Sequence, residues 1–198
     1  MSKVFTQANW MKFLRRGKSI YSYAELMRLT GLSEPALRRA LTRLGRRQFL
    51  TSLGKSLYAN TFKTPTLEEI ARLLYPPAYI SLESALFMHG IIDQAPHVLH
   101  GVTLNKTKSF STALGEIAYF HIKTELFFGY AAQERTFLAE PEKAALDFIY
   151  LQRQNGLAPI PDEWNWDHLD RRRLREIMTP YPETVKKAAA RFMNDFAK

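Results

Sequence analysis

Hydrophobic residues recur at steps of three and four through residues 10–44, which is the spacing of amphipathic helices. The pattern predicts helices over about residues 7–16 and 23–29, and a third that begins after Ser33. Gly31 lies between the last two helices and offers a left-handed turn that ends the earlier one. The apolar positions that carry this pattern are Trp10, Phe13, Leu14, Leu26, Met27, Leu29, Leu37, Ala40, Leu41 and Leu44.

Polar residues at the predicted helix starts support these boundaries. Ser22 and Glu25 have the spacing of a capping box, in which each side chain satisfies a free backbone donor. Ser33 is placed to cap the third helix, and Pro35 suits its first turn because no backbone N–H is needed there. Two short helices joined by a tight turn at Gly31 are typical of the helix-turn-helix motif.

The pattern then changes to that of short strands. Residues 48–52 and 57–62 predict two strands joined by a turn that contains Gly54. A helix, a helix-turn-helix and a hairpin in this order predict a winged helix over residues 1–64. The hairpin turn carries Lys55 and Ser56, which are suited to contact a phosphate or the minor groove.

The second part, residues 65–198, mixes helical and strand patterns. Its short segments rich in Val, Ile, Phe and Tyr predict an antiparallel sheet. The expected fold is therefore α+β, with a winged helix-turn-helix over residues 1–64 and a mixed α+β domain with C-terminal helices over residues 65–198. The predicted strands span 98–104, 117–123, 125–130 and 136–139, and the helices that follow span 140–155, 167–178 and 182–197.

Positive charge is concentrated in the first part. Residues 1–64 contain 13 Lys and Arg against two Glu, a net charge of +11, whereas residues 65–198 contain 15 Lys and Arg against 17 Asp and Glu, a net charge of −2. A basic module joined to a near-neutral one indicates a polyanionic partner for the basic module. We therefore expect residues 1–64 to bind double-stranded DNA.

The second helix of a helix-turn-helix enters the major groove, where Arg reads guanine and Ser or Thr contacts base edges or phosphates. Side chains on its exposed face are therefore candidates for reading bases, and cations farther along the chain are candidates for holding phosphates. An alternative is a helix-turn-helix that makes only protein contacts, with solvated arginines. The first group is Ser33, Arg38, Arg39 and Thr42, and the second is Arg43, Arg46, Arg47, Lys55 and Ser56.

Several classes of chemistry lack support in the sequence. The chain has no Cys, which excludes disulfides, thiolate metal sites and cysteine nucleophiles, and it has no phosphate-binding glycine loop and no nucleophile elbow. Asp93, His97 and His100 have helical spacing, but Pro96 interrupts that helix, so we expect neither a metal site nor a cofactor. The first residues lack the apolar core of a signal peptide, and we expect a cytoplasmic protein with no membrane partner.

One enzymatic alternative rests on Glu140, Glu142, Lys143 and Asp147. Carboxylates and a lysine near a strand end resemble the Glu-x-Lys element by which many nucleases hold Mg²⁺. We favour a simpler interpretation, in which Glu140 occupies the helix N-cap and Glu142 and Lys143 lie on a solvated first turn. The basic run from Arg171 to Arg175 is likewise expected to form a salt-bridged surface, through the pairs Asp167–Arg171 and Arg172–Glu176.

Two longer elements follow the basic N-terminal region. Residues 79–91 read YISLESALFMHGI, and residues 138–147 read LAEPEKAALD. Together with the predicted winged helix, they resemble the AbiEi-type antitoxins of type IV toxin–antitoxin systems, over about residues 20–150. The resemblance implies a repressor that binds inverted repeats in its operator and a C-terminal domain that counteracts a nucleotidyltransferase-type toxin. The alternatives are a nuclease-like enzyme and a stand-alone transcription factor whose second domain senses a ligand.

Overall fold

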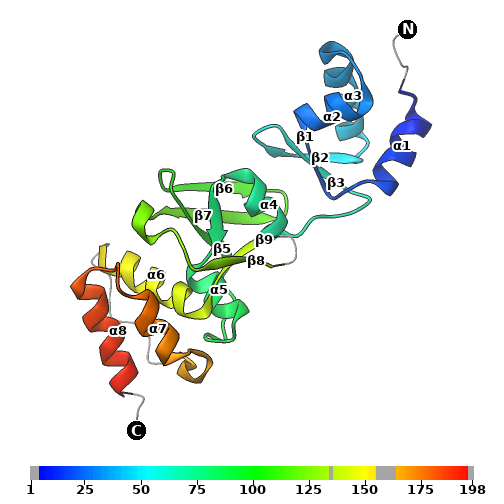
Figure 1. The fold of residues 1–198 in the computed structure, drawn as a ribbon. Helices are drawn as coiled ribbons and strands as arrows, with labels where there is room; N and C mark the ends of the chain where they lie inside the picture. The colour runs from blue at the N-terminus through cyan, green and yellow to red at the C-terminus, as the bar shows by residue number, and fades with distance from the viewer. Residues whose placement is uncertain (1–4, 134–135, 155–163, 196–198) are drawn as a thin grey trace. The chain divides into compact units, whose positions relative to one another are not determined.

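The structure, a computed structural model, describes residues 5–133, 136–154 and 164–195. The chain divides into two compact units: unit 1 comprises Met1–Ile70 with the short segment Thr112–Leu114, and unit 2 comprises Ala71–Ser111 with Gly115–Lys198. The division falls within a helix, α4 (Leu67–Leu74), rather than at the predicted boundary after Thr64. The fold is mixed α+β (Figure 1).

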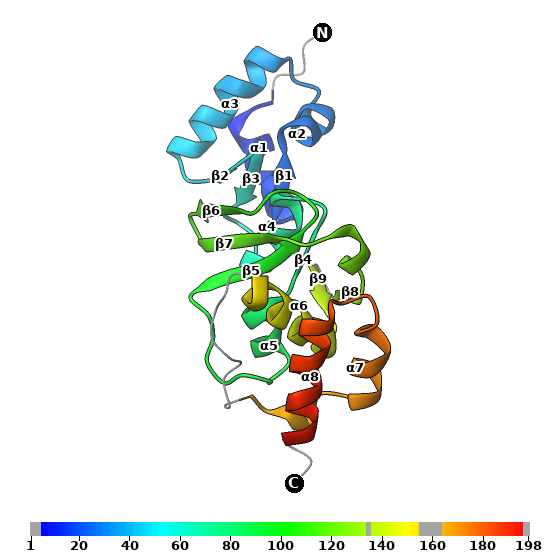
Figure 2. The same cartoon turned by 90° about the vertical axis from the view of Figure 1, so that its left-hand side faces the viewer.

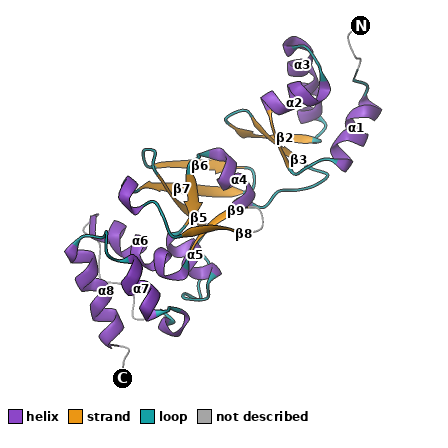
Figure 3. Ribbon diagram, in the orientation of Figure 1, coloured by secondary structure: helices purple, strands orange, loops and turns teal. Residues whose placement is uncertain are grey.

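Unit 1 contains three helices and a small antiparallel sheet (Figure 3). Strand β3 lies in the middle of the sheet and pairs with both β1 and β2. The predicted helices at residues 7–16 and 23–29 and the hairpin are present, whereas strand β1 was not predicted. The elements are α1 (Gln7–Arg16), β1 (Ile20–Ser22), α2 (Tyr23–Thr30), α3 (Glu34–Arg46), β2 (Leu50–Gly54) and β3 (Leu57–Asn60).

Two of the three caps predicted for α2 and α3 are present. The Ser22 hydroxyl accepts a hydrogen bond of 3.2 Å from the Glu25 N–H at the start of α2. Gly31 ends α2 with φ of 65°, in the left-handed region that glycine favours. Ser33 occupies the N-cap of α3, but its side chain makes no capping hydrogen bond, so this part of the prediction is wrong.

The core of unit 1 consists of the apolar positions that carry the helical periodicity. Trp10, Leu14, Leu26 and Leu37 are fully buried. One predicted core position is wrong, because Leu29 is 44% exposed. Thr30 is buried in α2 instead, since it lies one turn after Leu26 on the same face, and its hydroxyl donates to the Leu26 carbonyl at 2.7 Å.

Unit 2 contains a six-stranded sheet with the strand order β6-β7-β5-β4-β9-β8. Helices α5 to α8 lie on one side of this sheet in both views (Figures 1 and 2). The elements are β4 (Ala78–Ile80), α5 (Leu82–Met88), β5 (Val98–Thr103), β6 (Lys108–Thr112), β7 (Gly115–His121), η1 (Thr124–Leu126), β8 (Tyr130–Gln133), β9 (Thr136–Ala139), α6 (Pro141–Gln154), η2 (Trp166–His168), α7 (Arg171–Ile177) and α8 (Glu183–Asp195).

The sheet of unit 2 is mixed, so the prediction of an antiparallel sheet is wrong. Strand β5 pairs with β7 in parallel, and β4 pairs with β9 in parallel. The reason for the first pairing is the unpredicted strand β6, which lies outside β7. The chain runs out along β6 and returns along β7, so β7 has the same direction as β5.

Two further predictions for unit 2 are corrected. Residues 125–130 do not form a strand, because a 3-10 turn occupies Thr124–Leu126 and β8 begins only at Tyr130. The predicted helix over 167–178 is a 3-10 turn followed by the shorter α7, which the Asp170 side chain caps. Within the described ranges, no helix is long and apolar enough to cross a membrane.

Candidate nucleic-acid interface

The exposed face of α3 presents a row of arginines. Leu37, Ala40, Leu41 and Leu44 point into the core of unit 1, so the residues between them face outward. Arg39, Arg43 and Arg46 are all exposed, and their spacing of four and three places them on one side of the helix. In the part of the chain that the structure describes, none of these three guanidinium groups has a hydrogen-bond or ion-pair partner.

Arg38 differs from this row because other side chains hold it. Its Nε and Nη2 atoms donate to the same carboxylate oxygen of Glu34 at 3.1 and 2.7 Å. The guanidinium carbon lies 5.8 Å from the ring centre of Tyr23. The hydrogen bond to Glu34 raises the pKa of Arg38, so this group stays charged. Thr42, one turn later, donates its hydroxyl proton to the Arg38 carbonyl at 3.1 Å.

The remaining candidates on α3 lie at its ends. Ser33 is exposed at the N-cap. Arg47 is the exposed C-cap residue, and its N–H donates to the Arg43 carbonyl at 3.3 Å. Arg46 and Arg47 therefore stand at the negative end of the helix dipole, where cations are stabilised.

The turn of the β2–β3 hairpin exposes both candidates that were predicted there. Lys55 and Ser56 have φ of 45° and 59°, which L-residues other than Asn rarely adopt. The Ser56 carbonyl accepts a hydrogen bond of 2.8 Å from the Tyr23 N–H, and this bond ties the turn to the start of α2. The structure thus holds the hairpin turn in place beside the first turn of α2.

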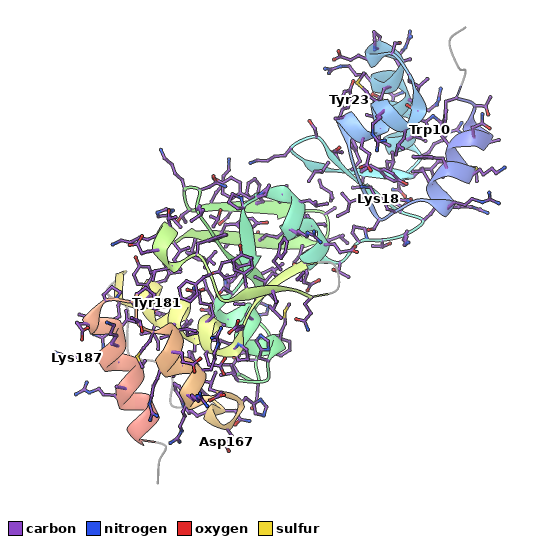
Figure 4. All side chains as sticks on the ribbon, in the orientation of Figure 1. Trp10, Lys18, Tyr23, Asp167, Tyr181 and Lys187 are labelled. Atoms are coloured by element: carbon purple, nitrogen blue, oxygen red, sulfur yellow. The ribbon has the colours of Figure 1, made fainter. Side chains whose placement is uncertain are left out.

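A groove of ≈ 440 Å³ lies between α3 and the hairpin. One of its walls is the side of α3 that carries Arg38 and Thr42. Tyr23, at the first position of α2, also lines it (Figure 4). The complete lining is Tyr23, Arg38, Leu41, Thr42, Gly45, Leu50, Ser52, Ser56 and Tyr58.

Sequence reasoning missed the three other lining residues that carry a hydroxyl, Tyr23, Ser52 and Tyr58. The signal that could have identified two of them is the alternation of side chains along the hairpin, because Ser52 and Tyr58 are partners in the β2–β3 register. Directly opposed residues in a strand pair place their side chains on the same face of the sheet. Counting the β2–β3 pairing back from the hairpin turn would therefore have placed the hydroxyls of Ser52 and Tyr58 on the same face.

Three of the four enzymatic candidates of unit 2 lie on the first turns of α6 and are buried, whereas Glu140 precedes the helix and its side chain is 34% exposed. Glu142 is 5% exposed, whereas Lys143 and Asp147 have no exposed surface. The prediction of a solvated first turn for Glu142 and Lys143 is therefore wrong. The physical reason is that α6 packs against α5, α7 and α8 and leaves no solvated side at these positions.

Each of these charged side chains holds another part of unit 2. The Glu140 carboxylate accepts hydrogen bonds from Nε and Nη2 of Arg173 at 2.8 and 3.1 Å. A carboxylate oxygen of Glu142 accepts from the Asp170 N–H at 2.7 Å, at the start of α7. Lys143 donates to Asp147 and, at 2.8 Å, to the hydroxyl of Tyr181, just before α8 (Figure 4).

Asp147 is the centre of the buried network. Its carboxylate accepts hydrogen bonds from the hydroxyls of Tyr79, Ser81 and Tyr181 at 2.8–2.9 Å. Burial, assisted by the Asp147 charge, raises the pKa of Tyr79 and of Tyr181, so both phenols remain protonated donors. Burial lowers the pKa of Lys143, and the Asp147 charge opposes this shift. The network is sealed from water and joins the sheet to α6 and the segment before α8.

One residue of the Asp93, His97 and His100 set has an acidic partner. His100 pairs with Glu83 at 3.0 Å. Across the described ranges, no three His, Asp or Glu side chains are grouped in a way that could hold a metal ion. Arg172 pairs with Glu176 at 3.4 Å as predicted, whereas Asp167 lies in η2, outside α7.

Comparison with known proteins finds no match for the chain. No family model matches it, and a search of curated proteins gives no significant match.

Proposed function

We propose that the chain is a sequence-specific DNA-binding repressor whose residues 1–64 form a winged helix. In this proposal α3 enters the major groove, and the β2–β3 hairpin is the wing. The observation that carries the proposal is the row of Arg39, Arg43 and Arg46 on one side of α3, which are exposed and have no partner among the residues that the structure describes. Unpaired guanidinium groups on a helix are the donors that duplex DNA accepts, through phosphates and through guanine O6 and N7.

The charge distribution supports the same partner. The net charge of +11 in residues 1–64 attracts a polyanion, whereas the net charge of −2 in residues 65–198 gives the second region no such preference. Lys55 at the hairpin turn adds an exposed cation beside α3. An interface that only contacts proteins needs neither this charge nor its alignment along one helix side.

We further propose that the repressor is the antitoxin of a type IV toxin–antitoxin operon and that unit 2 counteracts a nucleotidyltransferase-type toxin. This proposal rests on the resemblance of residues 79–91 and 138–147 to AbiEi-type antitoxins. The buried contacts of Glu142, Lys143 and Asp147 argue against the nuclease alternative, because a metal ion and a substrate would need access to these groups.

DNA binding is tested with the full chain and a duplex from upstream of its own coding sequence. We expect the duplex to be shifted in a gel at lower protein concentration than random DNA of equal length, and the double variant Arg39→Ala/Arg43→Ala to lose the shift. The control is Lys187→Ala/Arg191→Ala, which removes two exposed cations from α8 of unit 2. Equal loss of binding in both double variants, or no shift with the parent chain, contradicts the proposal.

The antitoxin role is tested by co-expression with the neighbouring toxin gene. We expect the full chain to restore growth, and the Arg39→Ala/Arg43→Ala variant to restore growth while it no longer represses the promoter. Promoter repression without any restoration of growth would favour the stand-alone regulator.

A further inference from the structure

We infer that the groove between α3 and the β2–β3 hairpin holds one phosphate group of the DNA backbone, through neutral hydroxyl donors and Arg38. This inference rests on the proposed function and deepens it, because it assigns the groove side of α3, with Arg38 and Thr42, to the DNA backbone. It also changes the sequence-based assignment, in which Arg38 and Thr42 were candidates for reading bases.

The two sides of α3 carry different chemistry at the same spacing. Arg38, Thr42 and Gly45 lie at steps of four and three and line the groove. Arg39, Arg43 and Arg46 have the same steps, one position later, and do not line it. One position along a helix is a rotation of about 100°, so the two rows face different directions. A single helix orientation on DNA therefore gives them different contacts.

The groove has the donors that a phosphate group requires. Phosphate oxygens only accept hydrogen bonds, and Ser, Thr, Tyr and Arg side chains commonly donate to them. In the described part of the chain, the hydroxyls of Ser56 and Tyr58 have no hydrogen-bond partner, although both residues line the groove. The Ser52 hydroxyl only accepts a long bond of 3.5 Å from the Gly54 N–H, so its own proton is free to be donated.

Arg38 is oriented for this role by its own helix. Glu34 engages Nε and Nη2, so this carboxylate does not use the protons of Nη1. Because a salt bridge and the ring of Tyr23 restrict this guanidinium, it loses less conformational freedom on binding than the unpartnered Arg39 does. A positioned cation beside neutral hydroxyls suits a fixed anionic group such as one backbone phosphate.

Gly45 offers a way to fill the groove without damaging the fold. A Cβ added at this glycine would meet only the Leu50 carbonyl oxygen, at 3.8 Å, which is an ordinary contact. Gly45 lies inside α3, where alanine is the better helix former, so Gly45→Ala should fold at least as well as the parent. The added methyl group would narrow the groove from its α3 wall.

The experiment measures Kd of the full chain for its operator and for random duplex over a range of salt concentrations. We expect Tyr58→Phe and Ser56→Ala each to weaken binding about 2–10-fold, which is the value of one net hydrogen bond. Gly45→Ala should also weaken binding, because its added methyl group narrows the groove. The loss should be equal on both duplexes, and the salt dependence should not change because no charge is removed. Arg38→Ala should also weaken binding to both duplexes by the same factor. Because it removes a charge, it should reduce the magnitude of the slope of log affinity against log salt by about one.

Two comparisons make the test specific. Tyr130→Phe removes a phenol hydroxyl from unit 2 and should leave Kd unchanged. Replacing single operator phosphates by methylphosphonate should reveal one position at which the Tyr58→Phe penalty disappears, since the two changes remove the same contact.

The failure of this inference is distinguishable from failure of the proposed function. If the parent chain does not bind DNA, the proposed function is wrong. If it binds and Arg39→Ala lowers discrimination, while the three groove variants match the parent, the groove inference alone is wrong. The inference is also wrong if Arg38→Ala abolishes discrimination between the duplexes, or if no methylphosphonate position couples to Tyr58.

Discussion

Two ion pairs with the same spacing have opposite surroundings in this protein. Glu34 and Arg38 on α3 lie four residues apart, as do Lys143 and Asp147 on α6. The side chains of the first pair are 55% and 70% exposed, whereas those of the second have no exposed surface. Solvent can replace either partner of the exposed pair, but it cannot reach the buried pair.

This difference separates charges that serve a partner from charges that serve the fold. In water an i,i+4 pair contributes little to stability, and its groups stay available to another molecule. A buried pair has lost its hydration, so each group depends on the other and on the hydroxyls of Tyr79, Ser81 and Tyr181. An acidic and a basic residue four positions apart can therefore have either role, and only their burial distinguishes the two cases.

The largest effect should come from breaking the buried pair. Lys143→Ala leaves the Asp147 carboxylate buried without its cation, and such changes cost about 3–5 kcal/mol. Urea unfolding of the full chain should report this loss, whereas Lys187→Ala, at an exposed position of α8, should not change the transition. A Lys143→Ala variant as stable as the parent would contradict the structural role of the network.

The double variant Lys143→Met/Asp147→Leu sharpens this result. Because both charges are removed together, no unpaired buried charge remains, and we expect the variant to be more stable than Lys143→Ala. A double variant no more stable than Lys143→Ala would show that the unpaired charge of Asp147 is not what destabilises the single variant.

Some elements of this fold could be predicted from the sequence and others could not. The helices of unit 1 were predictable because their determinants are local: Ser22 caps α2, Gly31 ends it, and the apolar steps of α3 point inward. The direction of β7 was not predictable, because it depends on β6, a polar edge strand without a hydrophobic run. Parallel pairing is decided between segments that are distant along the chain, so no short window contains the information.

The burial of Lys143 had a signal in the sequence that the interpretation of a solvated turn overlooked. From Ala144 to Leu151 every residue except Asp147 is apolar or aromatic, so no polar side exists on this helix. A helix that is hydrophobic all round is buried, and a Lys and an Asp one turn apart within it must then pair. The groove residue Tyr58 was missed for a different reason, because its position depends on the register of the hairpin.

A smaller effect, on DNA binding, is expected from replacing an exposed arginine of α3. If Arg39 reads a guanine through two hydrogen bonds, Arg39→Ala should cost about 1–3 kcal/mol on the operator and less on random DNA. Competition binding with both duplexes measures this difference. An equal loss on both would move Arg39 from the base-reading group to the phosphate-binding group.

The smallest effect should come from the hairpin turn. Lys55→Ala removes one exposed cation and should weaken binding to operator and random duplex by the same factor, because a phosphate contact carries no sequence information. Titrations of both duplexes at one salt concentration suffice. If Lys55 alone controlled sequence preference while Arg39 did not, the assignment of α3 as the recognition helix would be wrong.

The dependence of DNA affinity on salt tests the central claim most directly. With five or six phosphates neutralised, the logarithm of the association constant should fall against the logarithm of salt concentration with a slope of about −5. Arg43→Ala should bring this slope about one unit closer to zero, and Lys187→Ala in unit 2 should leave it unchanged. A slope near zero, or a slope that responds to Lys187 and not to Arg43, would contradict the account.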